Sequence, residues 1–262
     1  MHTASPFIVA TKVDDVVPPA VEGTLSILKS AAKYNSSIKR VIVTSSIASV
    51  MDLHPTMRTY TEEDWNTHST QEIEEKGDAT DPTHIYLGSK ALAEKAAWEW
   101  YESAKEKVGW DLVAILPGFV FGPLLQEIDS PSQLNYSMGL FFQGAMSGTS
   151  SEVTQEKALT LIGGWVDVRD VADAHVAALT VEAAKNQRFI TSNWSCCVQD
   201  ISNAVHKINP NIPNRFPYLQ IPLPAKNFDS GKSKAVLGIK YKSLEETTKD
   251  SLADFKKRGW IQ

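Results

Sequence analysis

Two short apolar runs constrain the fold of this 262-residue chain most strongly. Residues 40–44 and 111–116 are continuous and rich in aliphatic and β-branched side chains, a pattern typical of strands buried on both faces of a parallel sheet. An amphipathic segment, 20–33, precedes the first run, and an Ala- and Glu-rich segment, 85–107, precedes the second. Helices that alternate with buried strands predict an α/β fold with a doubly wound parallel sheet.

The same patterns extend to the rest of the chain. Three further helices and one short strand are expected at 168–184, 197–208, 244–258 and 188–191. The segment 52–83 is polar and lacks periodicity, so we expect a long surface excursion with at most one helical turn near 70–76. The proline-rich segment 209–224 separates the last two helices and indicates a small C-terminal lobe.

Charge and composition exclude several kinds of partner. Lys and Arg total 26 and Asp and Glu total 31, a net charge of −5 without clustering, so no nucleic-acid partner is indicated. No stretch resembles a membrane helix of about 20 apolar residues, and residues 1–15 lack the basic start of a signal peptide. Adjacent Cys196 and Cys197 are poorly placed for a disulfide, so we expect free thiols, a reducing compartment and a cytoplasmic protein. The chain shows no zinc spacing, and no metal is expected.

Tyr86 and Lys90, at the start of the predicted helix 85–107, are the residues best suited to chemistry. Four residues turn a helix by about 400°, so the two side chains lie about 40° apart on one face and about 6 Å apart along the axis. An ammonium near a phenol favours the phenolate, so we expect Lys90 to lower the pKa of Tyr86 and make it a usable acid or base. A serine hydroxyl at the end of the strand 40–44 could hold a substrate carbonyl oxygen.

This pair belongs to a longer succession of motifs. In chain order they are His2-Thr3-Ala4-Ser5-Pro6-Phe7, Pro19-Ala20-Val21-Glu22-Gly23-Thr24, Val43-Thr44-Ser45-Ser46, Tyr86-Leu87-Gly88-Ser89-Lys90, Leu116-Pro117-Gly118-Phe119-Val120-Phe121-Gly122-Pro123 and Trp165-Val166-Asp167-Val168-Arg169-Asp170. The succession spans nearly the whole chain and resembles the extended short-chain dehydrogenase/reductases, especially the dihydroflavonol reductases and the fungal ketone and methylglyoxal reductases. The resemblance implies NADPH-dependent reduction of a small ketone or aldehyde to an alcohol, with NADH as the alternative cofactor.

The resemblance also implies an organisation and a set of site residues. It implies a Rossmann-type dinucleotide-binding domain in 1–122, and a mixed region in 123–262 that holds a substrate lobe and a helix and strand returning to the main domain. The implied catalytic triad is Ser46, Tyr86 and Lys90. Tyr86 would protonate the carbonyl oxygen, Lys90 would lower the pKa of Tyr86 and bind the nicotinamide ribose, and Ser46, rather than Ser45, would orient the carbonyl.

Further positions follow from the same resemblance. Residues implied around the cofactor are Ala4, Ser5, Thr44, Tyr86, Lys90, Pro117 and Val120. Residues implied at the edge of the substrate pocket are Phe7, Ile47 and Phe121. Members of the family often pair their long helices in dimers, so the resemblance implies a homodimer through 25–33 and 92–107.

One expected element is missing from the sequence. Relatives begin with a strand, a Gly-x-x-Gly-x-x-Gly turn and a helix whose N-terminus receives the pyrophosphate. Neither Gly144 and Gly148 nor Gly163 and Gly164 have that strand-turn-helix context. Residues 2–6 correspond to the end of about the fourth strand in relatives, so we expect an N-terminally truncated chain that lacks roughly 80 residues.

Two other functions stay open. A sugar-nucleotide epimerase or dehydratase shares the fold and the triad, but its substrate calls for cationic and polar groups in the C-terminal lobe. The lobe offers apolar residues that favour a smaller substrate: Phe119, Phe121, Leu124, Leu125, Phe141 and Phe142. A chain without the glycine-rich turn could also be a non-catalytic remnant that acts as a binding module.

Overall fold

A parallel sheet forms the centre of the first of two compact units. The computed structural model describes residues 1–5, 12–34, 37–53, 58–146, 154–159, 161–214, 216–220 and 226–261. Unit 1 comprises Met1–Pro117, Asp173–Thr191 and Asp229–Ile239, and unit 2 comprises Gly118–Ala172, Ser192–Phe228 and Lys240–Gln262. Each unit is therefore built from three separate stretches of the chain.

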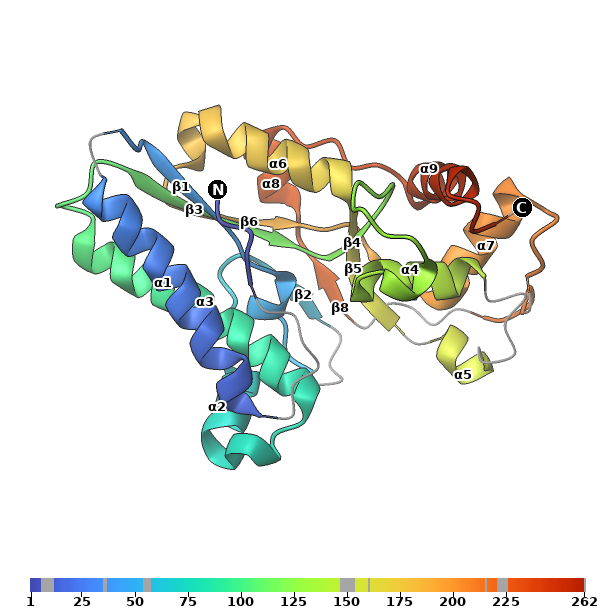
Figure 1. Ribbon diagram of the computed structural model, residues 1–262, viewed down its shortest axis with the longest axis horizontal. Helices are drawn as coiled ribbons and strands as arrows, with labels where there is room; N and C mark the ends of the chain where they lie inside the picture. The colour runs from blue at the N-terminus through green and yellow to red at the C-terminus, as the bar shows by residue number, and fades with distance from the viewer. Residues whose placement is uncertain are drawn as a thin grey trace. The chain divides into compact units, whose positions relative to one another are not determined.

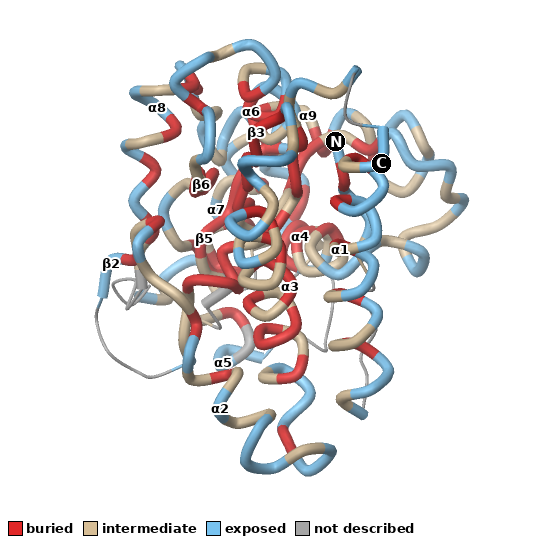
Figure 2. The backbone as a smooth tube through the Cα atoms, turned by 90° about the vertical axis from the view of Figure 1, so that its left-hand side faces the viewer, coloured by how far each residue is buried: buried red, intermediate tan, exposed pale blue. Residues whose placement is uncertain are grey.

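The sheet of unit 1 has three parallel strands in the order β1 (Arg40–Thr44), β3 (Asp111–Pro117) and β6 (Gln187–Thr191) (Figure 1). His2 forms a parallel bridge to Val43 of β1. All seven residues of β3 are buried, and the six that follow Asp111 are apolar, as expected of a strand buried on both faces; β3 appears in red in Figure 2.

Helices cover both faces of this sheet, as the doubly wound prediction requires. α1 (Val17–Lys33) and α3 (Pro82–Ala104) pack against each other and against one face, where Leu28, Val43 and Leu112 belong to a shared core. α6 (Val168–Thr180), which belongs to unit 1 from Asp173 onward, runs along the other face (Figure 1). The predicted α/β class is confirmed, and so are the predicted strands 40–44, 111–116 and 188–191.

The segment 52–83 differs from the prediction. It contains a three-residue strand, β2 (Arg58–Tyr60), and a full helix, α2 (Thr67–Lys76), instead of at most one helical turn. α2 is polar on most of its surface, so periodicity could not reveal it; its start is fixed by the buried Asn66, whose Oδ1 accepts from the Ser69 amide at 2.9 Å. α2 packs closely on α3 at Gly88, where a Cβ atom would meet the backbone oxygen of Ser69.

The predicted helices near the C-terminus are present with adjusted ends. α6 ends at Thr180, and residues 182–184 of the predicted helix form a separate short turn of 3-10 helix. α7 (Val198–Ile208) and α9 (Leu244–Lys257) agree closely with prediction, and α8 (Gly231–Leu237) was not predicted.

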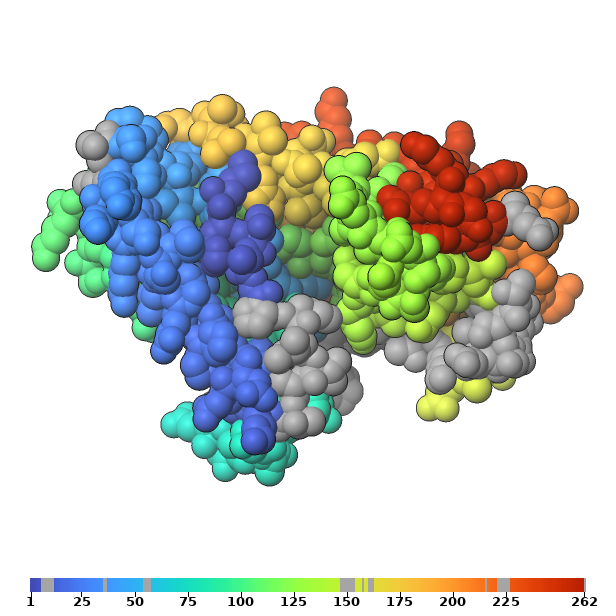
Figure 3. All heavy atoms as spheres, viewed as in Figure 1, coloured from blue at the N-terminus to red at the C-terminus, as the bar shows by residue number. Residues whose placement is uncertain are grey.

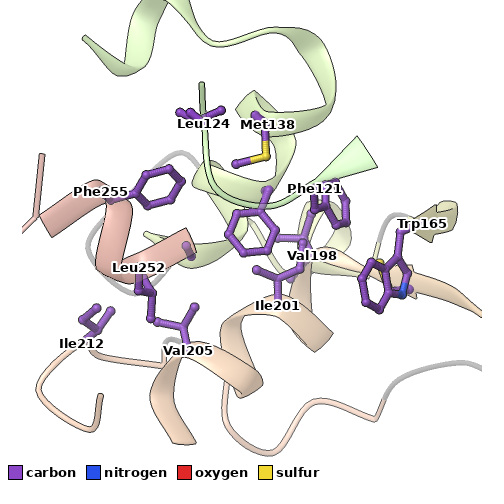
Figure 4. Close-up of a cluster of buried hydrophobic side chains, with 14 residues drawn as sticks. Phe121, Leu124, Met138, Trp165, Val198, Ile201, Val205, Ile212, Leu252 and Phe255 are labelled. Carbon is purple, nitrogen blue, oxygen red and sulfur yellow. The ribbon is translucent and has the colours of Figure 1, made fainter. Parts of the chain in front are cut away.

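Unit 2 is held together by an aromatic core. Its sheet pairs β4 (Phe119–Phe121) in parallel with β5 (Leu161–Asp167), and β5 antiparallel with β7 (Ser195–Cys197). Around it lie α4 (Tyr136–Ala145), α5 (Gln155–Ala158), α7 and α9. Phe121, Trp165, Ile201 and Phe255 meet in the core shown in Figure 4. The last strand of unit 2 is β8 (Lys226–Phe228).

Outside these cores the described residues offer few other chemical features. Cys196 and Cys197 are buried free thiols, and burial raises the pKa of the Cys197 thiol to about 11. Among the described residues there is no group of three or more His, Cys, Asp or Glu side chains suited to a metal ion. A search of the same residues finds no helix with the length and apolar character needed to cross a bilayer.

Candidate active site

Tyr86 and Lys90 lie on consecutive turns of α3 and face the same side. α3 begins at an Asp81 cap, whose Oδ1 accepts from the Thr83 amide at 2.8 Å, with Pro82 in the first turn. The Nζ of Lys90 lies 5.8 Å from the centroid of the Tyr86 ring. Both side chains are half-buried, so they form part of the fold and stay partly open to solvent.

Ser46 reaches the same place from the carboxyl end of β1. Its hydroxyl oxygen accepts from the Ala48 amide at 3.1 Å and caps a short 3-10 turn, Ile47–Ser49. The Ser46 side chain lies near enough to Tyr86 for hydrogen bonding to lower the pKa of the phenol. The carboxyl ends of parallel strands are the usual place for ligand sites in α/β sheets, and the three predicted triad residues meet here.

The pKa values differ in direction from the sequence-based expectation. Burial raises the pKa of Tyr86 above its usual value, and the hydrogen bond with Ser46 opposes that rise. Burial also lowers the pKa of Lys90 to about 8. The net shift of the Tyr86 pKa is therefore upward, so Tyr86 is a protonated phenol at neutral pH, and the lowering effect expected of Lys90 stays a prediction. A protonated phenol is the form that can donate a proton.

The remaining predicted cofactor residues are spread over the two units. Thr44 ends β1, and its Oγ1 lies 2.7 Å from Nε2 of His175. Pro117 ends β3 and is buried at the same carboxyl edge. Ala4 is exposed and Ser5 is half-buried, both just after the edge residue His2. Val120 lies on β4 in unit 2 and is half-buried.

The predicted substrate residues have mixed positions. Ile47 follows Ser46 and is 3% exposed, and Phe7 lies outside the described residues. Phe121 is fully buried in unit 2, with its ring centroid 5.2 Å from that of Phe141 and 5.9 Å from that of Trp165. Leu125 is 98% exposed. The apolar residues from which a small substrate was argued therefore do not line one surface.

Sequence reasoning missed three residues near the triad. His2 is buried, and burial together with the positive charge of Lys90 lowers its pKa. Glu94 lies one further turn along α3 from Lys90 and pairs with Arg188 at 2.7 Å. The four-residue spacing of Tyr86, Lys90 and Glu94 was a signal that could have revealed Glu94.

The site fits the nicotinamide end of a dinucleotide. Among the described residues no carboxylate forms an ion pair with the Lys90 ammonium, although burial penalises its charge. An uncompensated cation beside two hydroxyls suits a polar ligand that carries ribose hydroxyls and presents a carbonyl. No glycine-rich turn for the pyrophosphate is present in the sequence.

Comparison with known families gives one match that covers most of unit 1. The model of an NAD-binding family described as "Male sterility protein" matches residues 1–168, which is more than half of the chain.

Individual relatives match almost the whole chain. The NADPH-dependent methylglyoxal reductase of Saccharomyces cerevisiae is 35% identical over 269 residues, covering 98% of this chain and 76% of the relative. A ketoreductase of Aspergillus niger is 32% identical over 258 residues, covering 96% of this chain and 73% of the relative. The crystal structure of the yeast methylglyoxal/isovaleraldehyde reductase with NADPH superposes with a TM-score of 0.82 at 33% identity, covering 99% of this chain and 77% of that one.

Proposed function

Because the chain belongs to the extended short-chain dehydrogenase/reductases, we propose that it reduces a ketone or aldehyde to an alcohol with NADPH. The observation that carries the proposal is the meeting of Ser46, Tyr86 and Lys90 at the carboxyl end of β1. The yeast relative supports the cofactor and the reaction, since it is named as an NADPH-dependent methylglyoxal reductase and its crystal structure is a complex with NADPH.

The proposed mechanism assigns one task to each triad residue. NADPH, when bound, supplies the hydride. The Tyr86 hydroxyl donates its proton to the carbonyl oxygen, and the Ser46 hydroxyl donates a hydrogen bond that orients the same oxygen. The Lys90 ammonium, 5.8 Å from the Tyr86 ring centroid, stabilises the phenolate that remains. Carbonyl, hydride and proton together give the alcohol.

The cofactor and substrate contacts beyond the triad are also part of the proposal. Thr44 and Pro117 at the carboxyl edge of the sheet, and Ala4 and Ser5 beyond His2, are proposed to approach the cofactor. Ile47, adjacent to Ser46, is the proposed substrate neighbour with the most direct support.

A binding titration followed by turnover tests the proposed function. Tryptophan quenching of the purified chain by NADPH should saturate, and the Lys90→Ala variant should bind much more weakly. Lys39→Ala is the matched control, because Lys39 is exposed and precedes β1 at the opposite end of the strand from Ser46. Loss of NADPH absorbance with methylglyoxal, isovaleraldehyde and an aryl ketone then tests reduction.

The outcome also separates the rival functions. A folded chain that binds neither NADPH nor NADH would contradict the proposal and favour a non-catalytic binding module. Binding with conversion of a nucleotide-diphosphate sugar, and without net oxidation of NADPH, would favour the epimerase, for which the relatives give weaker support.

We further propose a homodimer and a cytoplasmic location. The outer face of α1 supports the first, because Ile27 is 42% exposed there and the helix lies uncovered on the face shown in Figure 3. The free thiols of Cys196 and Cys197 support the second. Sedimentation equilibrium of the purified chain, with Ile27→Glu as the comparison, tests the dimer.

A further inference from the structure

Glu94 is a buried carboxylate that completes a stripe along α3. Tyr86, Lys90 and Glu94 follow at four-residue intervals, so all three point to the same side of the helix. Glu94 is only 2% exposed. A buried carboxylate is costly unless charged and polar partners compensate it, so the identity of these partners shows what Glu94 holds.

One carboxylate oxygen of Glu94 binds the residues on either side of Ser46. Its Oε2 accepts from the Ser45 hydroxyl at 2.5 Å and from the Ser49 hydroxyl at 2.6 Å. The Ser49 amide also donates to the Ser46 carbonyl oxygen at 3.0 Å. Hydrogen bonds to an ionised acceptor are short and strong, so these contacts fix the backbone that carries Ser46.

The other carboxylate oxygen of Glu94 contacts the sheet through Arg188. Oε1 of Glu94 accepts from Nε of Arg188 at 2.7 Å and from the indole N–H of Trp98 at 3.2 Å. Arg188, on β6, also donates to the carbonyl oxygens of Glu62 at 2.5 Å and Asp64 at 3.0 Å. Its guanidinium carbon lies 3.7 Å from the ring centroid of Trp65. The arginine is therefore immobilised on several sides, and it fixes Glu94 in turn.

The two adjacent serines, Ser45 and Ser46, have different partners. The Ser45 hydroxyl donates to Glu94, whereas the Ser46 hydroxyl acts on Tyr86 and lowers the pKa of that phenol. Glu94 and Tyr86 both lie on α3. The serine loop, residues 45–49, is thus held to α3 by Glu94, and this fixes where Ser46 lies relative to the Tyr86 phenol.

We propose that Glu94, supported by Arg188, is a positioning residue that holds the serine loop in register with α3, so that Ser46 and Tyr86 present their hydroxyls to one carbonyl oxygen. Glu94 does not touch the reacting atoms in this assignment. Its effect on turnover rests on the proposed function, whereas its effect on the contact between Ser46 and Tyr86 does not.

The test reads that contact directly at Tyr86. Replacing Tyr86 with 3,5-difluorotyrosine lowers the intrinsic pKa of the phenol and gives a single ¹⁹F signal, so the phenol can be titrated within the pH range of the folded protein. Ser46→Ala in this background removes the contact and sets the size of a full pKa rise. Glu94→Gln is expected to raise the pKa in the same direction, because an uncharged amide holds the serines and Arg188 less firmly.

A matched control tests for a general effect of removing a carboxylate from α3, and a second variant replaces Glu94→Gln if that variant does not fold. Glu99→Gln removes a carboxylate from the exposed side of the same helix and should leave the ¹⁹F titration unchanged. If Glu94→Gln does not fold, Ser45→Ala removes a single contact to Glu94 while Ser49 and Arg188 stay bound, and it should still raise the pKa of residue 86.

Kinetics supply the second readout. Glu94→Gln should lower kcat by about 10-fold to 10²-fold, the effect of a small misplacement of a reacting group, with the KM for NADPH nearly unchanged. The double variant Ser45→Ala/Glu94→Gln should lose less than the product of the two single losses, because both act through one contact. An unchanged ¹⁹F titration in folded Glu94→Gln, or independent losses in the double variant, would overturn the proposal. A shifted titration in a chain without turnover would leave the positioning role standing and count against the proposed function.

Discussion

Two deeply buried carboxylates, Glu94 in unit 1 and Asp167 in unit 2, each pair with an arginine, and the two pairs have different functions. In unit 1, Glu94 pairs with Arg188. In unit 2, Asp167 is fully buried and accepts from Nε of Arg169 at 2.9 Å and from its terminal nitrogen at 2.8 Å. Both are built from the same charge-assisted contacts, so the difference lies in what else each carboxylate binds.

The further partners of the two carboxylates show that Asp167 stabilises the packing of unit 2, whereas Glu94 supports the candidate active site. Asp167 also accepts from the Thr247 hydroxyl at 2.7 Å, and Arg169 reaches Asp250 at 2.6 Å, which ties the end of β5 to α9. Glu94 instead binds the two serines that flank Ser46. Among the described residues, the contacts of Asp167 include no triad member. An arginine–carboxylate pair thus has no intrinsic role, and its function depends on the segments it joins.

The largest expected effect is the loss of turnover when the reacting hydroxyl of Tyr86 is removed. Tyr86→Phe removes only the reacting hydroxyl, so turnover should fall by about 10²-fold to 10⁴-fold, the usual contribution of a general acid. NADPH binding and the urea midpoint should stay near those of the unchanged protein. Steady-state kinetics beside urea unfolding check this, and turnover within a factor of about three of the starting value would remove Tyr86 from the mechanism.

Lys90 sharpens the comparison because burial penalises its charge and, in the part of the chain that the structure describes, no carboxylate forms an ion pair with it. Its pKa of about 8 predicts that kcat falls as the pH rises through about 8, since the ammonium is lost. Lys90→Arg stays charged, so this limb of the pH profile should move to higher pH. If the limb stays near pH 8 in that variant, another group is responsible.

The lowered pKa of Lys90 predicts that stability changes with pH in the direction opposite to kcat. Between about pH 8 and the ordinary lysine pKa of 10.5, the unfolded chain binds more protons at Lys90 than the folded chain. The free energy of unfolding should therefore rise with pH across that window, and Lys90→Met should be more stable than the unchanged protein at pH 7. Urea unfolding at pH 7 and pH 10 measures both differences.

Asp167→Asn tests the scaffold side of the comparison. It should lower the free energy of unfolding by up to about 3 kcal/mol, the lower end for loss of one partner of a buried ion pair, because the Arg169 side chain is 37% exposed. The kcat per folded molecule should not change. Asp173→Asn, an exposed carboxylate of α6, is the matched control and should alter neither quantity.

The pH dependence of this loss has a definite sign. Burial alone would raise the pKa of Asp167, but its hydrogen bonds with Arg169 and Thr247 outweigh that penalty and lower it. Because the pKa is lowered by folding, the ionised carboxylate stabilises the fold above the unfolded pKa of 3.8. This stabilisation is lost as the pH falls through the pKa of the folded protein. The gap between Asp167→Asn and the unchanged protein should therefore narrow below pH 4.

The comparison also shows how far the sequence could lead. Buried strands and the pair Tyr86 and Lys90 are local patterns, with periods of two or four residues or a continuous apolar run, so they were predictable. Glu94 extends the same helix period and was within reach. Its partner Arg188 is 94 residues away, and no local pattern joins the two. Buried polar networks are therefore harder to predict than the surfaces that they organise.

Unit 2 was less predictable for a different physical reason. β4 and β7 are three residues long, and Gly163 and Gly164 interrupt the apolar character of β5, so none of them has the length that a strand pattern needs. Phe121 is apolar and follows a family motif, which suggested a pocket, yet it packs between Phe141 and Trp165. Apolar character predicts burial well, but it does not distinguish a core from a pocket.

The smallest expected effect tests whether the two oxygens of Glu94 have separate roles. Trp98→Phe removes the longest contact of Glu94, 3.2 Å, and leaves the serines and Arg188 in place. One lost hydrogen bond should lower the free energy of unfolding by about 1 kcal/mol, while kcat changes less than twofold. Ser45→Ala removes one hydrogen bond from the other oxygen and should reverse this pattern, with a larger loss of kcat. Equal kinetic losses in the two variants would mean that Glu94 acts on the site through the stability of α3 and not through the serine loop.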